Sequence, residues 1–308
     1  MTDIAAAIDV GTNSTKMAVA ELRDGAPRIL FDRSEITRLG KGVDKSKLLS
    51  AEAVDRTLDA ITRFAGEARA HGVKTIVAAG TSALRDASNG QAFIDAVRER
   101  SGVEIEIIVG DREAELAYAA VRGDRAIWSG KSANLLVFDI GGGSTELIVG
   151  TSTGVDRHRS LDIGAVRLTE RFIKSDPPTD TEIAAVEEFA RSAFEGFGHI
   201  DAPVEVAGIG GTAVNLATTS LGKRDANVHG LTMARAIVGD VYHRLRTLPL
   251  AERRHVPGLE PERADVFVAG AAILIQLLDF AHAPDFRVST HGVRYGLLVE
   301  CARRLTSG

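Results

Sequence analysis

A local repeat constrains the fold of this chain more than any other feature of its sequence. The segment IDVGTNSTKMAVAEL, which begins at Ile8, is echoed by FDIGGGSTELIVG, which begins at Phe138. Identical residues recur at one constant spacing of 130 residues, the separation of Asp9 from Asp139. The other matching pairs are Gly11 and Gly141, Ser14 and Ser144, Thr15 and Thr145, and Val19 and Val149. A motif repeated in this way indicates two half-chains that open with the same local structure.

The pattern within and between the two copies predicts an α/β fold. In each copy an apolar run ends in Asp, a turn of Gly and hydroxyl residues follows, and apolar residues resume, which is typical of a β-hairpin. Apolar periodicity predicts helices over residues 51–71, 89–101 and 179–196, and strands over 75–79, 103–109 and 204–207. Further helices are expected near 111, 212, 231, 263 and 294, with a buried one over 266–278. Strands that alternate with helices form layered α/β domains.

The length of 308 residues fits two domains of ordinary size. We expect the junction near residues 122–129, with the first domain over residues 1–122 and the second over 123–296. The C-terminal helix, over residues 297–308, is expected to pack back on the first domain.

Composition narrows the classes of protein to which the chain belongs. There are 37 basic and 42 acidic side chains, a net charge of -5, so a global positive field for nucleic acid is absent. The lone Trp128 and three tyrosines give no aromatic ladder for stacking bases. The single Cys301 excludes an internal disulfide. No signal peptide or membrane span is visible, so we expect a cytoplasmic protein without nucleic-acid or membrane partners.

The two repeated loops have properties suited to phosphate. The first, over residues 9–16, offers a glycine, three polar side chains and the charge of Lys16, although an ordinary hairpin turn would look similar. The second, over residues 139–146, holds three consecutive glycines whose amides can form an anion-binding nest. Its carboxylates, Asp139 and Glu146, suit Mg²⁺. The alternative for this loop is a β-bulge with incidental acids.

Three further segments carry candidate residues, each with a structural alternative. A glycine turn over 208–212 follows a strand and opens a helix, where free amides favour an anion, but such turns are often only structural. Arg85 follows another strand and its guanidinium can hold phosphate, while Ser88 in the same segment reads equally as a helix cap. Glu113 and Glu115 also suit the first turn of a helix, where acids complement the dipole.

Several motifs together resemble one family, the exopolyphosphatase and guanosine pentaphosphate phosphohydrolase (Ppx/GppA) family. They are the two loops, GTSALRDASN from Gly80, GDREAEL from Gly110, SLDIGAVRLTE from Ser160, GIGGTAVNLA from Gly208 and RADVFVAGAAIL from Arg263. The resemblance covers nearly the whole chain, in order. It implies two ribonuclease-H-like (actin-like) α/β domains with a cleft between them and no C-terminal helical extension, as in the superfamily of actin, sugar kinases and heat-shock chaperone ATPases.

The resemblance also implies roles for individual residues. Glu113 falls on the catalytic glutamate that activates water, and Asp139 and Glu146 on the catalytic carboxylates that hold metal. Arg85 falls on an arginine that contacts substrate phosphate. The expected phosphate-binding residues are Gly11, Thr12, Asn13, Ser14, Lys16, Arg85, Gly141, Gly142, Gly143, Ser144, Thr145, Gly210, Gly211 and Thr212. Mg²⁺ is the implied cofactor, with Mn²⁺ as a substitute and K⁺ as a further candidate, and a homodimer is expected.

This sequence departs from the family pattern in ways that bear on substrate. Lys16 and Glu115 stand where arginine is frequent, and a lysine is a point charge rather than a bidentate fork. The chain ends at Gly308, without the helical domains of long members, which favours short polyphosphate chains. Candidates for local positive charge are Arg38, Lys41, Lys45, Lys47, Lys223, Arg224, His229, Arg263 and Arg294.

The leading hypothesis is an exopolyphosphatase that releases terminal orthophosphate from short polyphosphate, processively or stepwise. Hydrolysis of guanosine pentaphosphate (pppGpp) is an alternative with the same machinery. A non-catalytic polyphosphate or alarmone sensor and a kinase that makes ATP are hypotheses of other classes. The eight histidines follow no spacing typical of a metal motif, so the sequence does not predict zinc.

Overall fold

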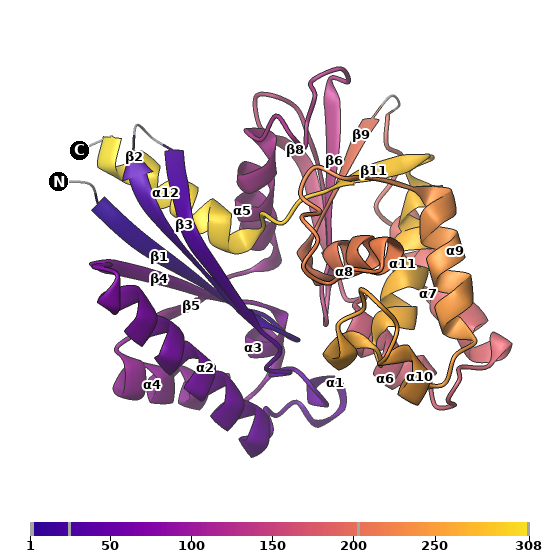
Figure 1. Cartoon of the computed structure of the whole chain (residues 1–308), viewed down its shortest axis with the longest axis horizontal. Helices are drawn as coiled ribbons and strands as arrows, with labels where there is room; N and C mark the ends of the chain where they lie inside the picture. Colours follow the sequence, from indigo (N-terminus) through magenta and orange to yellow (C-terminus); the bar gives the residue numbers. More distant parts are fainter. Residues whose placement is uncertain (1–2, 24–25, 202–203, 307–308) are drawn as a thin grey trace. The chain divides into compact units, whose positions relative to one another are not determined.

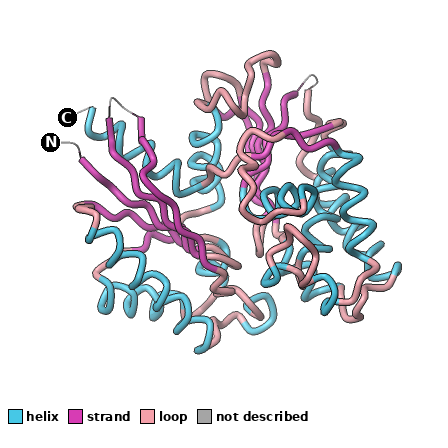
Figure 2. Tube along the Cα trace, viewed as in Figure 1, coloured by secondary structure: helices cyan, strands magenta, loops and turns pink. Residues whose placement is uncertain are grey.

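The structure is a computed structural model that describes residues 3–23, 26–201 and 204–306 (Figure 1). The chain separates into two compact units. Unit 1 comprises Met1–Ala120 and Gly292–Gly308, and unit 2 comprises Val121–His291. Each contains one mixed sheet and helices, as the colours of Figure 2 show, so the predicted α/β class is confirmed. Ser307 and Gly308, at the end of the expected C-terminal helix, lie outside the described residues.

Unit 1 is built on a five-stranded sheet in the order β3-β2-β1-β4-β5. Neighbours are antiparallel across β3, β2 and β1, and parallel from β1 through β4 to β5. The strands are β1 (Asp3–Val10), β2 (Thr15–Arg23), β3 (Ala26–Glu35), β4 (Thr75–Gly80) and β5 (Ile105–Ile107). The helices are α1 (Val43–Ser46), α2 (Ala51–Ala70), α3 (Ser82–Asp86), α4 (Gly90–Ser101), α5 (Gly110–Arg122) and α12 (Val293–Thr306).

Side-chain size along β1 and β2 decides which helices cover each face of this sheet. One face carries small residues, among them Ala5 and Ala7, which pack in one apolar cluster with residues of α5 and α12. The other face carries larger ones, such as Ile8 and Met17, which pack against α2 and α4. Because strand side chains alternate between faces, this small-and-large alternation follows directly from the sequence.

Unit 2 repeats this topology with one additional strand. Its sheet has the order β10-β11-β9-β6-β7-β8, in which β8-β7-β6-β9-β11 corresponds to β3-β2-β1-β4-β5. The strands are β6 (Asn134–Ile140), β7 (Thr145–Gly150), β8 (Val155–Leu161), β9 (Val204–Ile209), β10 (Thr232–Ala234) and β11 (Asp285–Val288). The helices are α6 (Ala165–Phe172), α7 (Asp180–Glu195), α8 (Gly210–Leu221), α9 (Arg235–Arg246), α10 (Leu250–Arg253), the 3₁₀ turn η1 (Pro261–Arg263) and α11 (Phe267–Phe280). The duplication predicted from the repeat is therefore confirmed.

Helix α11 forms the centre of the unit 2 core. It is apolar on all sides and lies among α6, α7, α8 and α9. Such a helix is typical of a large buried core. Among the described residues, no helix combines the length and the apolar character needed to cross a membrane.

Several predicted element boundaries were wrong. The strand expected over residues 103–109 is shorter in the structure, where β5 covers only Ile105–Ile107. Helix α5 begins soon after it, at Gly110. The helix expected near Leu231 begins at Arg235, after the short strand β10, which pairs with β11. Ser88 is not a helix cap, since α4 begins after Asn89 and the Ser88 hydroxyl donates to the carbonyl of Lys47.

Candidate functional site

The first repeated loop is a tight connection between β1 and β2. The amide of Gly11 donates to the carbonyl of Ser14 over 3.0 Å. The carbonyls of Thr12 and Asn13 accept hydrogen bonds from the segment after β3. The side-chain amide nitrogen of Asn13, Nδ2, is buried and has no hydrogen-bond partner among the residues that the structure describes. Since buried donors are normally satisfied, this nitrogen is suited to an acceptor that arrives with a ligand.

Opposite charges face each other at the base of the first loop. Asp9 and Lys16 are directly paired across β1 and β2. Burial raises the pKa of the Asp9 carboxyl, while the positive charges of Lys16 and Arg294 act in the opposite direction. Lys16 therefore stands beside both the loop and a partly buried acid.

The second repeated loop, between β6 and β7, has the same hairpin bond, from the Gly141 amide to the Ser144 carbonyl over 2.9 Å. The carbonyls of Gly141 and Gly142 accept the first amides of α6, at distances of 2.9 and 3.0 Å. The carbonyl of Gly143 accepts from Nε of Arg167 over 2.6 Å. In a trans peptide the N–H points away from the C=O. The amides of residues 142–144 therefore point away from α6, a direction in which they could donate to an anion.

Like charges face each other at the base of the second loop. Asp139 and Glu146 are directly paired across β6 and β7, at the positions that Asp9 and Lys16 occupy in unit 1. Both side chains lie on one face of the sheet, and the Ser160 hydroxyl donates to Glu146 Oε1 over 2.9 Å. Directly opposed like charges destabilise a strand pair. Two hard carboxylates held side by side on a rigid hairpin fit a divalent cation such as Mg²⁺.

The third loop lies against this acidic pair. Gly210 has a positive φ of 81°, and a Cβ there would overlap Oδ1 of Asp139. A Cβ on Gly211 would overlap the guanidinium of Arg263. The Thr212 hydroxyl donates to the carbonyl of Ile140 over 2.8 Å. The glycines therefore let the start of α8 approach the Asp139 carboxylate and Arg263 closely. The expected phosphate-binding role of this turn stays a prediction.

In unit 1, the structure brings together Arg85, from α3, and Glu113, from the first turn of α5. Arg85 Nη1 donates to Glu113 Oε2 over 2.8 Å and to the carbonyl of Ile108 over 2.9 Å. The Glu113 side chain is only 9% exposed, whereas that of Glu115 is 58% exposed and pairs with Arg112. Burial against an arginine distinguishes Glu113 from an ordinary first-turn acid.

Most of the other basic candidates either pair with acidic side chains or lie exposed on the surface. Arg263 bonds Glu260, and Arg294 donates through Nε to Asp32 over 3.0 Å. Lys41, Lys45, Lys47, Lys223 and Arg224 are exposed. Arg167 and Ser160, which hold the second loop and Glu146, were missed as site residues. Both belong to the SLDIGAVRLTE motif, whose polar residues were the available signal.

The sequence and the fold of this chain are similar to those of known proteins. The model of the Ppx/GppA phosphatase family matches residues 18–305. The chain belongs to this family. Exopolyphosphatase 2 of Mycobacterium tuberculosis is 32% identical over 96% of this chain and 98% of its own length. The crystal structure of the Aquifex aeolicus family member has a TM-score of 0.82 and 29% identity, with 99% of each chain covered. The expected actin-like α/β architecture of the family is thus confirmed.

Two other relatives are longer proteins. The bifunctional 3-dehydroquinate synthase/phosphatase of Fusobacterium nucleatum is 30% identical over 96% of this chain, which spans 46% of that protein. The guanosine-5'-triphosphate,3'-diphosphate pyrophosphatase of Vibrio atlanticus is 31% identical over 96% of this chain, which spans 58% of it. Family membership and these names indicate a phosphoanhydride hydrolase.

Proposed function

We propose that this phosphoanhydride hydrolase is an exopolyphosphatase that releases the terminal orthophosphate of short inorganic polyphosphate. The observation that carries the proposal is the acidic pair, Asp139 and Glu146, on a hairpin whose loop amides point away from α6. The mycobacterial relative named exopolyphosphatase matches over 98% of its length, against 58% for the Vibrio pyrophosphatase. We therefore propose polyphosphate, rather than pppGpp, as the preferred substrate.

In the proposed reaction, a water oxygen attacks the terminal phosphorus and the bond from that phosphorus to the bridging oxygen breaks. Glu113 accepts the proton of the water, and the products are orthophosphate and a chain shortened by one phosphate. A general base of this kind contributes about 10²- to 10⁴-fold to the rate. Arg85 holds the Glu113 carboxylate in one orientation and presents further N–H donors to phosphate oxygens.

The two repeated loops bind phosphate in this proposal. Asn13 Nδ2 supplies a donor that lacks a partner within the described protein, and Lys16 supplies positive charge. In unit 2 the amides of residues 142–144 donate to phosphate oxygens. Phosphoryl transfer depends mainly on such positioning and charge stabilisation, since its transition state is loose.

Asp139 and Glu146 would hold Mg²⁺, with Mn²⁺ as a substitute. When bound, this ion neutralises charge on phosphate oxygens as it develops. Ser160 keeps the Glu146 carboxylate in position, and Gly210 leaves room beside Asp139. K⁺ and a homodimeric state remain further proposals from the family resemblance.

The test measures orthophosphate release from polyphosphates of defined short length, from long-chain polyphosphate and from pppGpp, with Mg²⁺, Mn²⁺ or neither, and with K⁺ or Na⁺. We expect the highest kcat/KM on short polyphosphate with Mg²⁺. Asp139→Asn and Glu146→Gln should lose about 100-fold or more, the scale of removing one electrostatic stabiliser. The matched control is Asp156→Asn, on the exposed part of β8, which should retain full activity.

Each other outcome selects a different function. Faster turnover of pppGpp would make the chain a pppGpp phosphohydrolase. Binding of both compounds without phosphate release under any metal would make it a sensor. Formation of ATP from polyphosphate and ADP would make it a kinase.

A further inference from the structure

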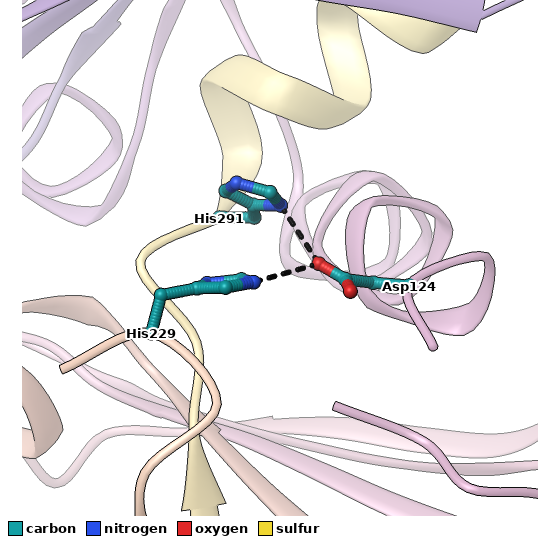
Figure 3. A group of neighbouring side chains, drawn as sticks. All are labelled: Asp124, His229 and His291. Atoms are coloured by element: carbon teal, nitrogen blue, oxygen red, sulfur yellow. Dashed lines mark ion pairs between the residues drawn. The ribbon is translucent and has the colours of Figure 1, made fainter. Parts of the chain in front are cut away.

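Three residues far apart in the sequence meet in unit 2, outside the proposed hydrolytic site (Figure 3). Asp124 follows α5, His229 precedes β10, and His291 follows β11. Asp124 Oδ2 lies 3.0 Å from Nε2 of His229 and 3.2 Å from Nδ1 of His291. The two imidazole rings lie against each other at a tilt, with centroids 4.4 Å apart and planes 33° apart. Two histidines thus converge on one carboxylate oxygen.

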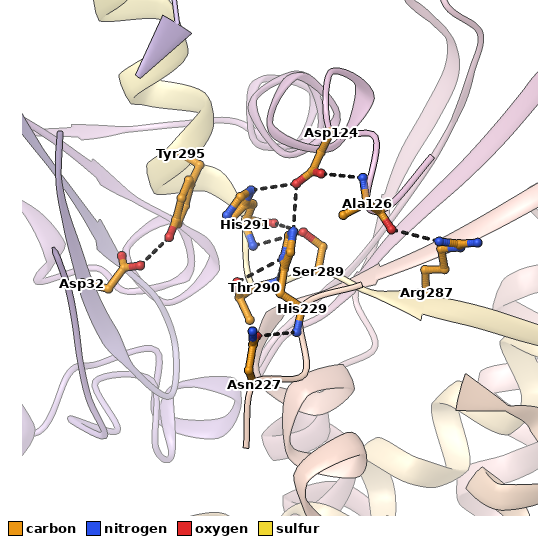
Figure 4. Close-up of polar contacts among 10 residues, drawn as sticks. All are labelled: Asp32, Asp124, Ala126, Asn227, His229, Arg287, Ser289, Thr290, His291 and Tyr295. Carbon is orange, nitrogen blue, oxygen red and sulfur yellow. Dashed lines mark hydrogen bonds and ion pairs between the residues drawn. The ribbon is translucent and has the colours of Figure 1, made fainter. Parts of the chain in front are cut away.

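Hydrogen bonds fix each member of this cluster (Figure 4). The amide of Ala126 donates to the other oxygen of Asp124, Oδ1, over 2.9 Å, so Oδ2 is directed at the rings. Nδ1 of His229 lies 3.3 Å from both the amide and the hydroxyl of Thr290. The amide of His291 donates to the Ser289 hydroxyl over 3.1 Å. The three side chains are therefore held in place before any ligand arrives.

The spacing of the three atoms fits a single metal ion. A tetrahedral ion with ligands at about 2.0–2.1 Å separates those ligands by about 3.3 Å. The two measured separations from Asp124 Oδ2, 3.0 and 3.2 Å, are close to that value. The donor set of two imidazole nitrogens and one carboxylate oxygen is one that zinc commonly takes in open sites, whereas Mg²⁺ prefers oxygen alone.

We propose that Asp124, His229 and His291 form a binding site for one first-row transition-metal ion, best filled by Zn²⁺. The three side chains are 17%, 21% and 28% exposed, so they are sheltered but reachable from solvent. Three protein ligands leave a fourth position for water. The three ligands are different residues from the Asp139 and Glu146 pair, and the proposal does not depend on the proposed hydrolytic activity.

Thr290 orients the imidazole ring of His229 in this proposal. Without metal, the Thr290 amide donates to Nδ1, and the ring proton on Nε2 bonds Asp124. If Nε2 bound a metal, the ring proton would lie on Nδ1, and the Thr290 hydroxyl 3.3 Å away could accept it. A partner on the second ring nitrogen is typical of metal-binding histidines, and its loss usually costs about 10- to 100-fold in affinity.

The site lies where the chain passes between its units in sequence. Unit 2 begins at Val121, three residues before Asp124, and it ends at His291 itself. A bound ion would therefore cross-link the two connecting segments, with His229 as a third anchor. This gives the site a structural consequence that can be measured as metal-dependent stability.

The experiment titrates the full-length protein, freed of metal by chelator, with Zn²⁺ in competition with a chromophoric chelator, and separately with Co²⁺ by visible absorption. With excess Mg²⁺ present to occupy the Asp139 and Glu146 pair, we expect one Zn²⁺ per chain, a tetrahedral Co²⁺ spectrum and a higher Tm with Zn²⁺. His229→Gln and His291→Gln should weaken Zn²⁺ affinity at least about 10-fold and abolish the Co²⁺ bands. Thr290→Val should weaken affinity about 10-fold while all three ligands stay in place.

Two controls separate this site from others. His199→Gln removes a surface histidine, 79% exposed and 3.7 Å from Asp201, and should leave Zn²⁺ affinity unchanged. Asp139→Asn should also leave it unchanged. Equal Zn²⁺ affinity in the wild type and in both histidine variants would overturn the proposal. The cluster would then only join its three chain segments by hydrogen bonds. If a histidine variant does not fold, two other results together would overturn the proposal. They are an unchanged Zn²⁺ affinity in Thr290→Val and the absence of Co²⁺ bands in the wild type.

Discussion

At the scale of single residues, one change of charge separates the two otherwise similar hairpins. The pair across β1 and β2 is Asp9 with Lys16, and the pair across β6 and β7 is Asp139 with Glu146. The first pair needs no added ion, because its charges are opposite. The second places two acids together on a rigid strand pair, which favours a bound cation. The same fold thus pairs an acid with a base in unit 1 and two acids in unit 2, and the proposed function uses the first for phosphate and the second for a cation.

A single residue also carries a pH-dependent part of the stability. Glu182 lies in the first turn of α7, where its carboxylate accepts hydrogen bonds from the amides of Thr179, Lys174 and Ser175. These bonds, led by that of Thr179, lower the pKa of Glu182 from 4.5 to about 2. A lowered pKa in the folded state stabilises the protein above the unfolded value and less as the pH falls through the folded value.

We therefore predict that Glu182→Gln lowers Tm relative to the wild type above about pH 4.5, and that the difference closes as the pH approaches 2. Thermal unfolding followed by circular dichroism between pH 2 and 7 measures it. The control is Glu188→Gln, which removes an acid from the same helix away from the capping box. A Tm difference that is constant with pH would show that the Glu182 carboxylate is not held as described.

At the scale of elements, α12 completes unit 1 although it comes from the far end of the chain. It covers the face of β1 and β2 that carries alanines, and its Gly296 contacts the backbone of α5. A Cβ at Gly296 would overlap the carbonyl of Leu116, which is helix backbone and is not free to move aside. The close approach of these two helices depends on this glycine.

We predict that Gly296→Ala destabilises the protein by about 1–3 kcal/mol, the usual cost of overpacking a core. Gly66→Ala is the matched control, since Gly66 lies within α2 with open space around the added methyl. It should stabilise by about 0.5–1 kcal/mol, because alanine favours a helix. Urea unfolding measures both changes, and equal effects of the two substitutions would contradict the packing of α12 on α5.

The elements that could be predicted from the sequence are those whose apolar pattern is strong. The hairpins at Asp9 and Asp139 and the helices α2 and α7 fall where they were expected. The strands β3 and β8 were missed, because edge strands carry many charged residues that hide the alternation of a strand. A helix was predicted near Leu231, where the short strand β10 precedes α9. The pairing of β10 with β11 is a tertiary contact that the local pattern does not contain.

The candidate site residues also divide into those with a local sequence signal and those that only tertiary contacts bring together. The loops were found because consecutive glycines and an exact repeat are local signals. The hydrogen bond between Arg85 and Glu113 joins residues 28 positions apart, and the cluster of Asp124, His229 and His291 spans most of unit 2. No sequence spacing predicts such contacts, since they depend on which strands become neighbours. The sequence did not predict zinc because the eight histidines follow no metal-motif spacing along the chain, and such spacing does not report which residues meet in the fold.

At the scale of the whole molecule, one topology is used twice with different chemistry. The corresponding strand orders are those of a duplicated unit, and the comparisons place the chain in the Ppx/GppA phosphatase family. In the proposed function, unit 1 contributes the base Glu113 and the charge of Lys16, and unit 2 contributes the cation site. The duplication explains why both units carry a phosphate-type loop, although only one carries two facing acids.

The most direct test of this account is orthophosphate release from short polyphosphate with Mg²⁺ by the wild type, by Glu113→Gln and by Glu115→Gln. Both variants remove one acid from the first two turns of α5, but only Glu113 is buried against Arg85. We predict a loss of about 10²- to 10⁴-fold in kcat for Glu113→Gln and nearly full activity for Glu115→Gln. Full activity in a correctly folded Glu113→Gln variant, or an equal loss in both, would contradict it.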